Sequence, residues 1–140
     1  MILYRKFIIG GISMKRKVIT AVICSILVVL ITISVGIGYN IYKSEYKLTD
    51  SGVEHSPDGK YSVTFQMVGY PQWPFGSTKA RVTVSETDSE KEITVINDEI
   101  SDDGANLRSE NWFVEWLDDT VKITLKGSEQ YDKLYTIPLG

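Results

Sequence analysis

The chain has 140 residues, which is enough for one small domain and a further short segment. Its charge is divided along its length: residues 1–17 carry five basic and no acidic side chains, whereas residues 43–140 carry 10 Lys and Arg against all 18 Asp and Glu. The acidic part disfavours nucleic-acid binding, because such binding needs clustered basic residues that displace counterions. The single cysteine, Cys24, precedes the acidic part, which therefore has no disulfide and must be stable through its core alone.

An uncharged segment of 22 residues, Val18–Tyr39, separates the basic and acidic parts. As a helix it would be about 33 Å long, enough to cross a hydrocarbon core of about 30 Å, so it predicts a single membrane-spanning helix. A cleaved signal peptide is the alternative, with Ser34–Gly36 as its exit, although the apolar core before that exit is long. A lipoprotein signal is disfavoured, because Cys24 follows Ile23 rather than a small residue.

The charge division predicts the topology, because basic flanks stay on the cytoplasmic side. We expect a cytoplasmic head, a transmembrane helix, a polar tether and a β-domain outside the cytoplasmic membrane, over residues 1–17, 18–39, 40–52 and 53–140. The sequence from Met14 to Val18 looks like an ordinary start of a membrane-inserted protein. Residues 1–13 are therefore interpreted as a start-site artefact, with a short interfacial helix as the alternative.

From Val53 onward, apolar residues alternate with a period of two, which predicts strands. The expected strands are 53–55, 60–68, 78–86, 92–98, 111–117, 121–127 and 135–137. Ser56–Gly59 predicts a tight turn, and Ile93 and Val95 are expected on one face of their strand. The fold class predicted is all-β: a small antiparallel β-sandwich or partly open barrel of about six or seven strands, preceded by one N-terminal transmembrane helix.

Few residues favour catalysis. His55 is the only histidine, it precedes a turn, and no G-x-S-x-G pattern accompanies it, so we interpret it as a solvated residue at a strand end. The carboxylate pairs Asp102-Asp103 and Asp118-Asp119 are sequence neighbours, which point to opposite faces of a strand rather than across a cleft. Asp118-Asp119 is interpreted as a turn. An acid-dependent hydrolase is therefore the least favoured function.

An acidic loop predicted over residues 99–110 matches part of a calcium-binding pattern. Glu99, Ser101, Asp103 and Glu110 would supply oxygen ligands, with Gly104 at the sharp turn. Glu and Ser at the first two ligand positions and flanking strands in place of helices weaken this interpretation. The alternative is a surface loop in which Gly104 adopts a positive φ. No other cofactor is expected.

Aromatic residues are numerous for so small a body. Trp112 and Trp116 share a face of one predicted strand, and we expect both to be largely buried. Tyr70, Trp73 and Phe75 lie among two prolines, which stiffen a loop. A stiff aromatic loop suits contact with a ligand or partner, since little ordering entropy is lost on binding. It equally suits a loop that caps one end of the sheets, which is the interpretation favoured here.

Five short stretches occur in order: SPDGKY, WPFG, DGAN, NWFVEW and GSEQYDKLY, between Ser56 and Tyr135. This series resembles a family of small membrane-anchored or lipid-anchored extracytoplasmic proteins of Gram-positive bacteria without an assigned function. The resemblance covers about residues 56–139 and implies no catalytic residues. It implies that Gly76 and Gly104 hold backbone angles that suit glycine, and that Asn106 or Asn111 bonds loop backbone. The chain departs from lipid-anchored members by lacking a usable lipobox.

The function expected from the sequence is a single-pass membrane protein that displays a small extracytoplasmic β-domain for binding or assembly, without catalysis. A sensor or accessory subunit of a membrane complex is the alternative. The expected partners are the lipid bilayer, through residues 18–39, and a further membrane or envelope protein, with no nucleic acid.

Overall fold

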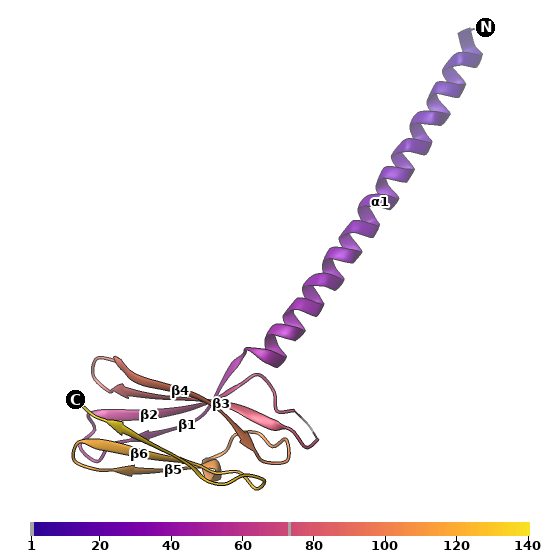
Figure 1. Cartoon of the computed structure of the whole chain (residues 1–140). Coiled ribbons are helices and arrows are strands. Elements are labelled where there is room, and N and C mark those ends of the chain that lie inside the picture. The colour runs from indigo at the N-terminus through magenta and orange to yellow at the C-terminus, as the bar shows by residue number, and fades with distance from the viewer. Residues whose placement is uncertain (1, 73) are drawn as a thin grey trace. The chain divides into compact units, whose positions relative to one another are not determined.

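The computed structural model describes residues 2–72 and 74–140, with only the backbone of residues 2–13. One long helix, α1 (Ile2–Glu45), precedes the strands (Figure 1). Its part Met14–Glu45 is long and apolar enough to cross a membrane, and its apolar side chains are exposed. A signal sequence near an N-terminus has the same character. The chain forms two compact units, Met1–Asn40 and Ile41–Gly140, and the second unit holds all the strands.

The second unit contains seven strands in two antiparallel sheets. The four-stranded sheet has the order β1 (Leu48–His55), β2 (Tyr61–Val68), β3 (Ser77–Glu86) and β4 (Glu92–Ser101). The three-stranded sheet has the order β5 (Trp112–Trp116), β6 (Thr120–Leu125) and β7 (Lys133–Pro138), and the short helix η1 (Ser109–Asn111) precedes it. The prediction of antiparallel sheets after an N-terminal helix is confirmed, and the strands within residues 48–138 do not close into a barrel.

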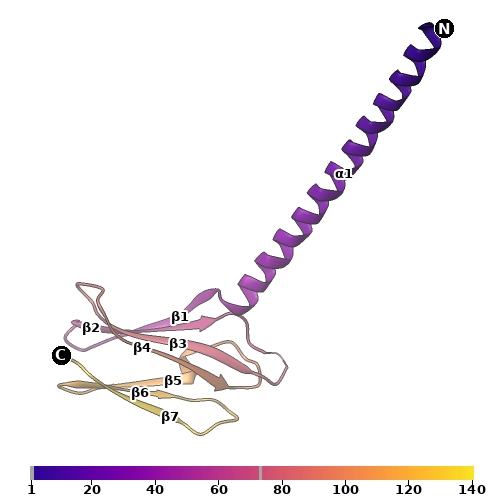
Figure 2. The ribbon, with the colours of Figure 1, turned by 45° about the horizontal axis from the view of Figure 1, so that its top comes forward.

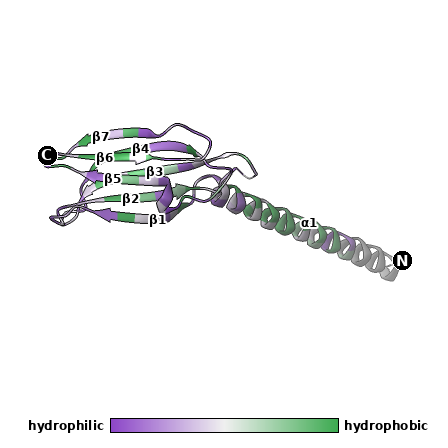
Figure 3. Ribbon diagram, turned by 90° about the horizontal axis from the view of Figure 1, so that it is seen from below, coloured by the Kyte–Doolittle hydropathy of each residue, from purple (hydrophilic) through white to green (hydrophobic). Residues whose placement is uncertain are grey.

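The two sheets lie face to face over a shared hydrophobic core (Figure 2). Apolar residues alternate with polar ones along the strands, as the hydropathy colouring of the ribbon shows (Figure 3). The fully buried members of the core include Val63, Phe65, Val82, Val84, Val121, Ile123 and Leu125. Phe65 of β2 stacks on Trp112 of β5, with ring centroids 4.2 Å apart and planes 7° from parallel. This stack joins the two sheets directly.

Glycine at position 52 makes room for that stack. β1 contains an irregularity in its pairing with β2 between Asp50 and Gly52. A Cβ atom on Gly52 would lie 2.7 Å from Cζ2 of Trp112, closer than carbon atoms approach. The indole N–H of Trp112 is directed at the carboxylate of Glu54, at 3.4 Å. Trp112 is 7% exposed, as expected, whereas Trp116 is only partly buried at the edge of the core.

The structure corrects several expected boundaries. β1 begins at Leu48 rather than Val53, and the segment expected as a tether contains the end of α1 and the beginning of β1. β4 continues to Ser101, so the acidic loop is shorter than expected. The expectation that Ile93 and Val95 share a face is wrong. A shift of register beside Val84 brings Ile93 and Ile96 against the core, in place of Ile93 and Val95.

Candidate functional site

The aromatic loop connects β2 to β3 and begins at Gly69, which has a φ of 70°. The amide of Tyr70 donates a hydrogen bond to the carbonyl of Ser44, at 2.8 Å. Tyr70 is 49% exposed, and the Lys43 ammonium lies 5.7 Å from the centre of its ring. Phe75 is 78% exposed, so the capping interpretation is wrong for this residue. Trp73, the third candidate, lies outside the residues that the structure describes.

Glycine is required at Gly76 and Gly104 for two different reasons. Gly104 has a φ of 66°, which confirms the expected positive angle. Gly76 does not have a positive φ; a side chain there would collide with the backbone and Cβ of Gln72, whose carbonyl accepts the Gly76 amide at 2.5 Å. The amide of Gly104 donates to the carbonyl of Gly76 at 2.9 Å. The second and third stretches of the resemblance are thus hydrogen-bonded to each other.

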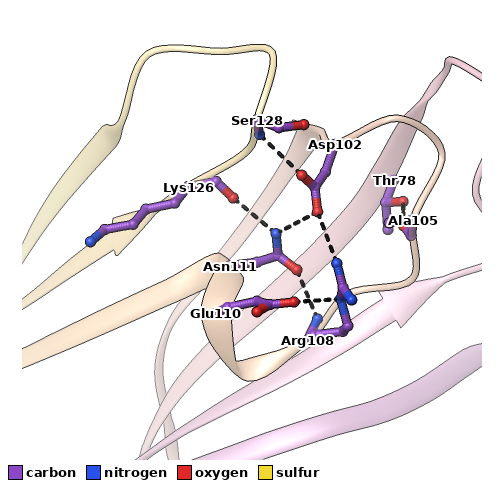
Figure 4. A network of polar contacts seen from close by, with 8 residues as sticks. All are labelled: Thr78, Asp102, Ala105, Arg108, Glu110, Asn111, Lys126 and Ser128. Carbon is purple, nitrogen blue, oxygen red and sulfur yellow. Dashed lines mark hydrogen bonds and ion pairs between the residues drawn. The ribbon is translucent and has the colours of Figure 1, made fainter.

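Asn111 is the centre of a polar network between loops of the two sheets (Figure 4). Its side-chain oxygen accepts the amide of Arg108 at 2.9 Å, which holds η1 to its own N-terminal residue. Its side-chain nitrogen donates to Asp102 at 3.0 Å and to the carbonyl of Lys126 at 3.1 Å. Asn111 is 4% exposed. The expectation that an asparagine bonds loop backbone is therefore confirmed for Asn111, whereas Asn106 is exposed.

Asp102 completes this loop network, which we define as Asp102, Arg108, Asn111 and Ser128 with the Lys126 carbonyl. Its carboxylate accepts the amide of Ser128 at 3.0 Å and lies 3.8 Å from the Arg108 guanidinium. The hydrogen bond from Asn111, aided by Ser128 and Arg108, lowers the pKa of Asp102 in spite of its partial burial. Asp102 therefore stays ionised and holds the β4–β5 connection to the β6–β7 loop.

A second set of bonds ties the β6–β7 loop to the end of β4. The amide of Ser101 donates to the side-chain oxygen of Gln130 at 2.9 Å, and the amide of Glu129 donates to the carbonyl of Ser101 at 3.1 Å. Gly127 packs so closely on Ser101 that a side chain would collide with it. Repulsion from the Asp103 carboxylate raises the pKa of Glu129. The last stretch of the resemblance, which begins at Gly127, is therefore bonded to the end of β4, beside the loop network.

The structure does not support the expected calcium ligands as a group. The Glu99 carboxylate, on β4, accepts the hydroxyl of Ser77 at 3.0 Å, whereas Glu110 pairs with Arg108 at 2.9 Å. Ser101 lies within β4, and Asp103 adopts a φ of 51° in the loop that follows. Among residues 14–72 and 74–140, no three His, Cys, Asp or Glu side chains are grouped to hold a metal ion. Calcium binding stays the less favoured interpretation of this loop.

Asp98 makes the link that sequence reasoning missed. On β4 it accepts hydrogen bonds from the Lys133 ammonium, at 2.8 Å, and from the Tyr135 hydroxyl, both on β7. Burial acts to raise the pKa of Asp98, but the bonds from Lys133, Tyr135 and its neighbouring amide outweigh it and lower that pKa. The hydrogen bond that the Tyr135 hydroxyl donates to Asp98 raises the pKa of Tyr135 to about 12. The sequence signal for Asp98 is the alternation of Ile96, Asp98 and Ile100. It places Asp98 on the inner face of β4 only when the register shift before Thr94 is taken into account.

The histidine and the carboxylate pair considered for catalysis lie on the surface and in a turn. His55 ends β1 and is exposed, as expected. Asp118 and Asp119 are exposed in the β5–β6 turn, where the Leu117 amide bonds the Thr120 carbonyl at 2.9 Å, which confirms the turn.

A shallow hollow of about 240 Å³ lies at this end of the sheets, and its lining includes Asp58, Asp118 and Trp116. The Ser56 hydroxyl and Lys60 amide lower the pKa of Asp58.

A row with two exposed apolar side chains crosses the outer face of the three-stranded sheet. Phe113 of β5 pairs with Thr124 of β6, which pairs in turn with Leu134 of β7, so the three side chains share a face. Phe113 is 58% and Leu134 63% exposed. The Lys126 ammonium lies 5.7 Å from the centre of the Phe113 ring. We call Phe113, Thr124 and Leu134 the outer row.

Comparison of the chain with protein-family models, curated proteins and solved structures found no match in any of the three.

Proposed function

We propose that the protein is a single-pass membrane protein of a Gram-positive bacterium that displays a two-layer β-sandwich outside the cytoplasmic membrane for binding or assembly. Residues 1–17 remain in the cytoplasm and residues 18–39 cross the bilayer. The uncharged 22-residue segment supports the span, and five basic residues before it with no acid support the orientation.

The outer row is the observation that carries the binding part of the proposal. Phe113 and Leu134 expose more than half of their side chains on a face where neighbouring strands could have presented polar residues. Phe113 and Leu134 flank Thr124 on this face, and exposed apolar patches on a surface mark interaction sites. Lys122 and Glu115 form a 3.7 Å ion pair in the next row, which gives the apolar row a polar border.

The environments of the carboxylates support a function without catalysis. A general acid of a hydrolase needs a carboxyl group whose pKa is raised. Asp98 and Asp102, the two partly buried carboxylates with altered pKa, have a lowered pKa and each holds two loops or strands together. Glu129 has a raised pKa but is fully exposed. These groups therefore have structural partners that account for their charges.

The test of the span uses the single cysteine. In a Cys24→Ser background, cysteines introduced at Lys17 and at Asp88 report opposite sides of the predicted membrane. On intact cells freed of their wall, a membrane-impermeant maleimide should label the Asp88 variant and spare the Lys17 variant until the membrane is opened. Release of the protein from membranes by alkaline extraction would refute the span and favour a cleaved signal.

The test of the binding role uses a photo-crosslinking amino acid in cells. Placed at Phe113 or Leu134, the amino acid should give one adduct of constant mass. Placed at Asp88, in the β3–β4 turn of the four-stranded sheet, it should give none. An adduct containing a membrane protein in equal amount would favour an accessory subunit. Equal crosslinking at all three positions, or none at any, would remove the outer row as the binding surface.

A further inference from the structure

The start of the aromatic loop is fixed to the last turn of α1. Residues Ile41–Glu45 belong to the same compact unit as the strands. Within this unit the Tyr70 amide bonds the Ser44 carbonyl at 2.8 Å, and the Gly69 amide bonds the Lys47 carbonyl at 2.9 Å. A side chain on Gly69 would collide with the Ser44 carbonyl. The backbone of the loop therefore cannot move away from Ser44 without breaking these contacts.

Ser44 lies only five residues beyond Tyr39, the end of the uncharged segment. In a helix, five residues rise about 7.5 Å. A bilayer has roughly 5–8 Å of headgroup region on each side of its hydrocarbon core. If residues 18–39 cross the membrane, Ser44 and the Tyr70 amide bonded to it lie at the depth of the headgroups, whatever direction the rest of the strands takes.

The side chains at this point have the character of an interfacial belt. Tyr42, Tyr46 and Phe75 are 57%, 66% and 78% exposed, and Tyr70 is 49% exposed. The Lys43 ammonium lies beside the Tyr70 ring. Tyrosine and other amphipathic rings collect at membrane interfaces, where the ring meets the acyl boundary and the hydroxyl meets water. Residues 69–76 contain no acidic side chain, so nothing in the loop repels an anionic headgroup.

We propose that Tyr70 and Phe75 of the aromatic loop, together with Tyr42 and Tyr46, contact the phospholipid headgroup layer of the bilayer that holds α1. This inference rests on the membrane-spanning part of the proposed function. The ligand is the lipid interface rather than a protein, because the loop is bonded to chain that has just left the membrane. The outer row then remains the surface for a protein partner.

A fluorescent reporter in the loop tests this contact in the full-length chain. In the Cys24→Ser background, Gln72→Cys carries an environment-sensitive dye, because Gln72 is exposed and lies between the proposed contact residues. The control carries the same dye at Asp88→Cys, in the β3–β4 turn. Since β3 has ten residues, the control dye is about 30 Å from the loop at 3.3 Å per residue. Both proteins are reconstituted in vesicles of phosphatidylcholine and phosphatidylglycerol with a headgroup-attached quencher.

We expect the Gln72 dye to lose most of its emission in these vesicles and the Asp88 dye to keep it. The double change Tyr70→Ser with Phe75→Ser keeps the backbone bonds to Ser44, so it should reduce the quenching at Gln72 without abolishing it, and thermal unfolding should show that the exposed positions tolerate it. Equal quenching at Gln72 and Asp88, or quenching unaffected by the double change, would overturn the contact. Alkaline extraction of the same vesicles reads the span separately, so a protein that resists extraction but shows no quenching refutes only this inference.

Discussion

Replacement of Gly52 by alanine tests how closely the two sheets are packed. The added Cβ atom would lie 2.7 Å from Cζ2 and 3.1 Å from Cη2 of Trp112. The indole cannot move away freely, because it is almost fully buried and stacks on Phe65 at 4.2 Å between centroids. Forcing an extra methyl group into a filled core costs about 1–3 kcal/mol. Gly52→Ala should therefore lower the free energy of unfolding by about 2 kcal/mol, or the melting temperature by roughly 8–16 °C.

A double-mutant cycle isolates this contact. Trp112→Phe shortens the ring that the new methyl group would meet, so Gly52→Ala should cost less in the Trp112→Phe background than in the natural chain, by about 1 kcal/mol or more. Gly140→Ala is the control, since a Cβ atom there meets nothing within 4 Å. Urea unfolding followed by tryptophan fluorescence is suitable, because all three tryptophans lie in the unit Ile41–Gly140. Equal costs of Gly52→Ala in both backgrounds would refute the packing argument.

Three further predictions concern polar groups. Asn111→Ala removes three hydrogen bonds at about 1 kcal/mol each and should lower stability by roughly 2–3 kcal/mol in urea unfolding, whereas exposed Asn106→Ala should not. Because the pKa of Tyr135 is raised from 10.0 to about 12, its stabilisation is complete below pH 10 and is lost as the pH rises through 12; melting scans over this range should lose that slope in Tyr135→Phe. Millimolar Ca²⁺ should leave the melting temperature unchanged, and a rise that Asp103→Asn abolishes would restore the calcium site.

The strand pattern could be predicted well because it depends on local alternation. Val63, Phe65 and Met67 alternate on β2, and Val82 and Val84 on β3, and all five are buried. The failure on β4 has a local cause as well: one register shift leaves Ile93 between the paired residues Glu92 and Thr94, so Ile93 packs on the core together with Ile96 rather than Val95, and nothing in the sequence indicates this shift. A single irregularity therefore changed the predicted core on that strand.

The polar links could not be predicted, because they join residues distant in the chain. Asp98 and Tyr135 are 37 positions apart, and their contact depends on how β4 lies over β7. Sequence could identify Asn111 as a residue able to bond backbone, but not that its partners would be Asp102 and the Lys126 carbonyl. The need for glycine at position 76 could not be predicted either, because it comes from the close approach of Gln72 and not from the φ of Gly76.

The loop network has a consequence for the rates of folding and unfolding. Three of its bonds span 9 to 26 positions of sequence and together connect the end of β4, η1 and the loop between β6 and β7, so we expect them to form only after both sheets have formed. Interactions absent from the folding transition state act almost wholly on the unfolding rate. Removal of Asn111 should therefore speed unfolding while leaving refolding nearly unchanged. For a domain without disulfides, slow opening of this end would be the main protection against proteases.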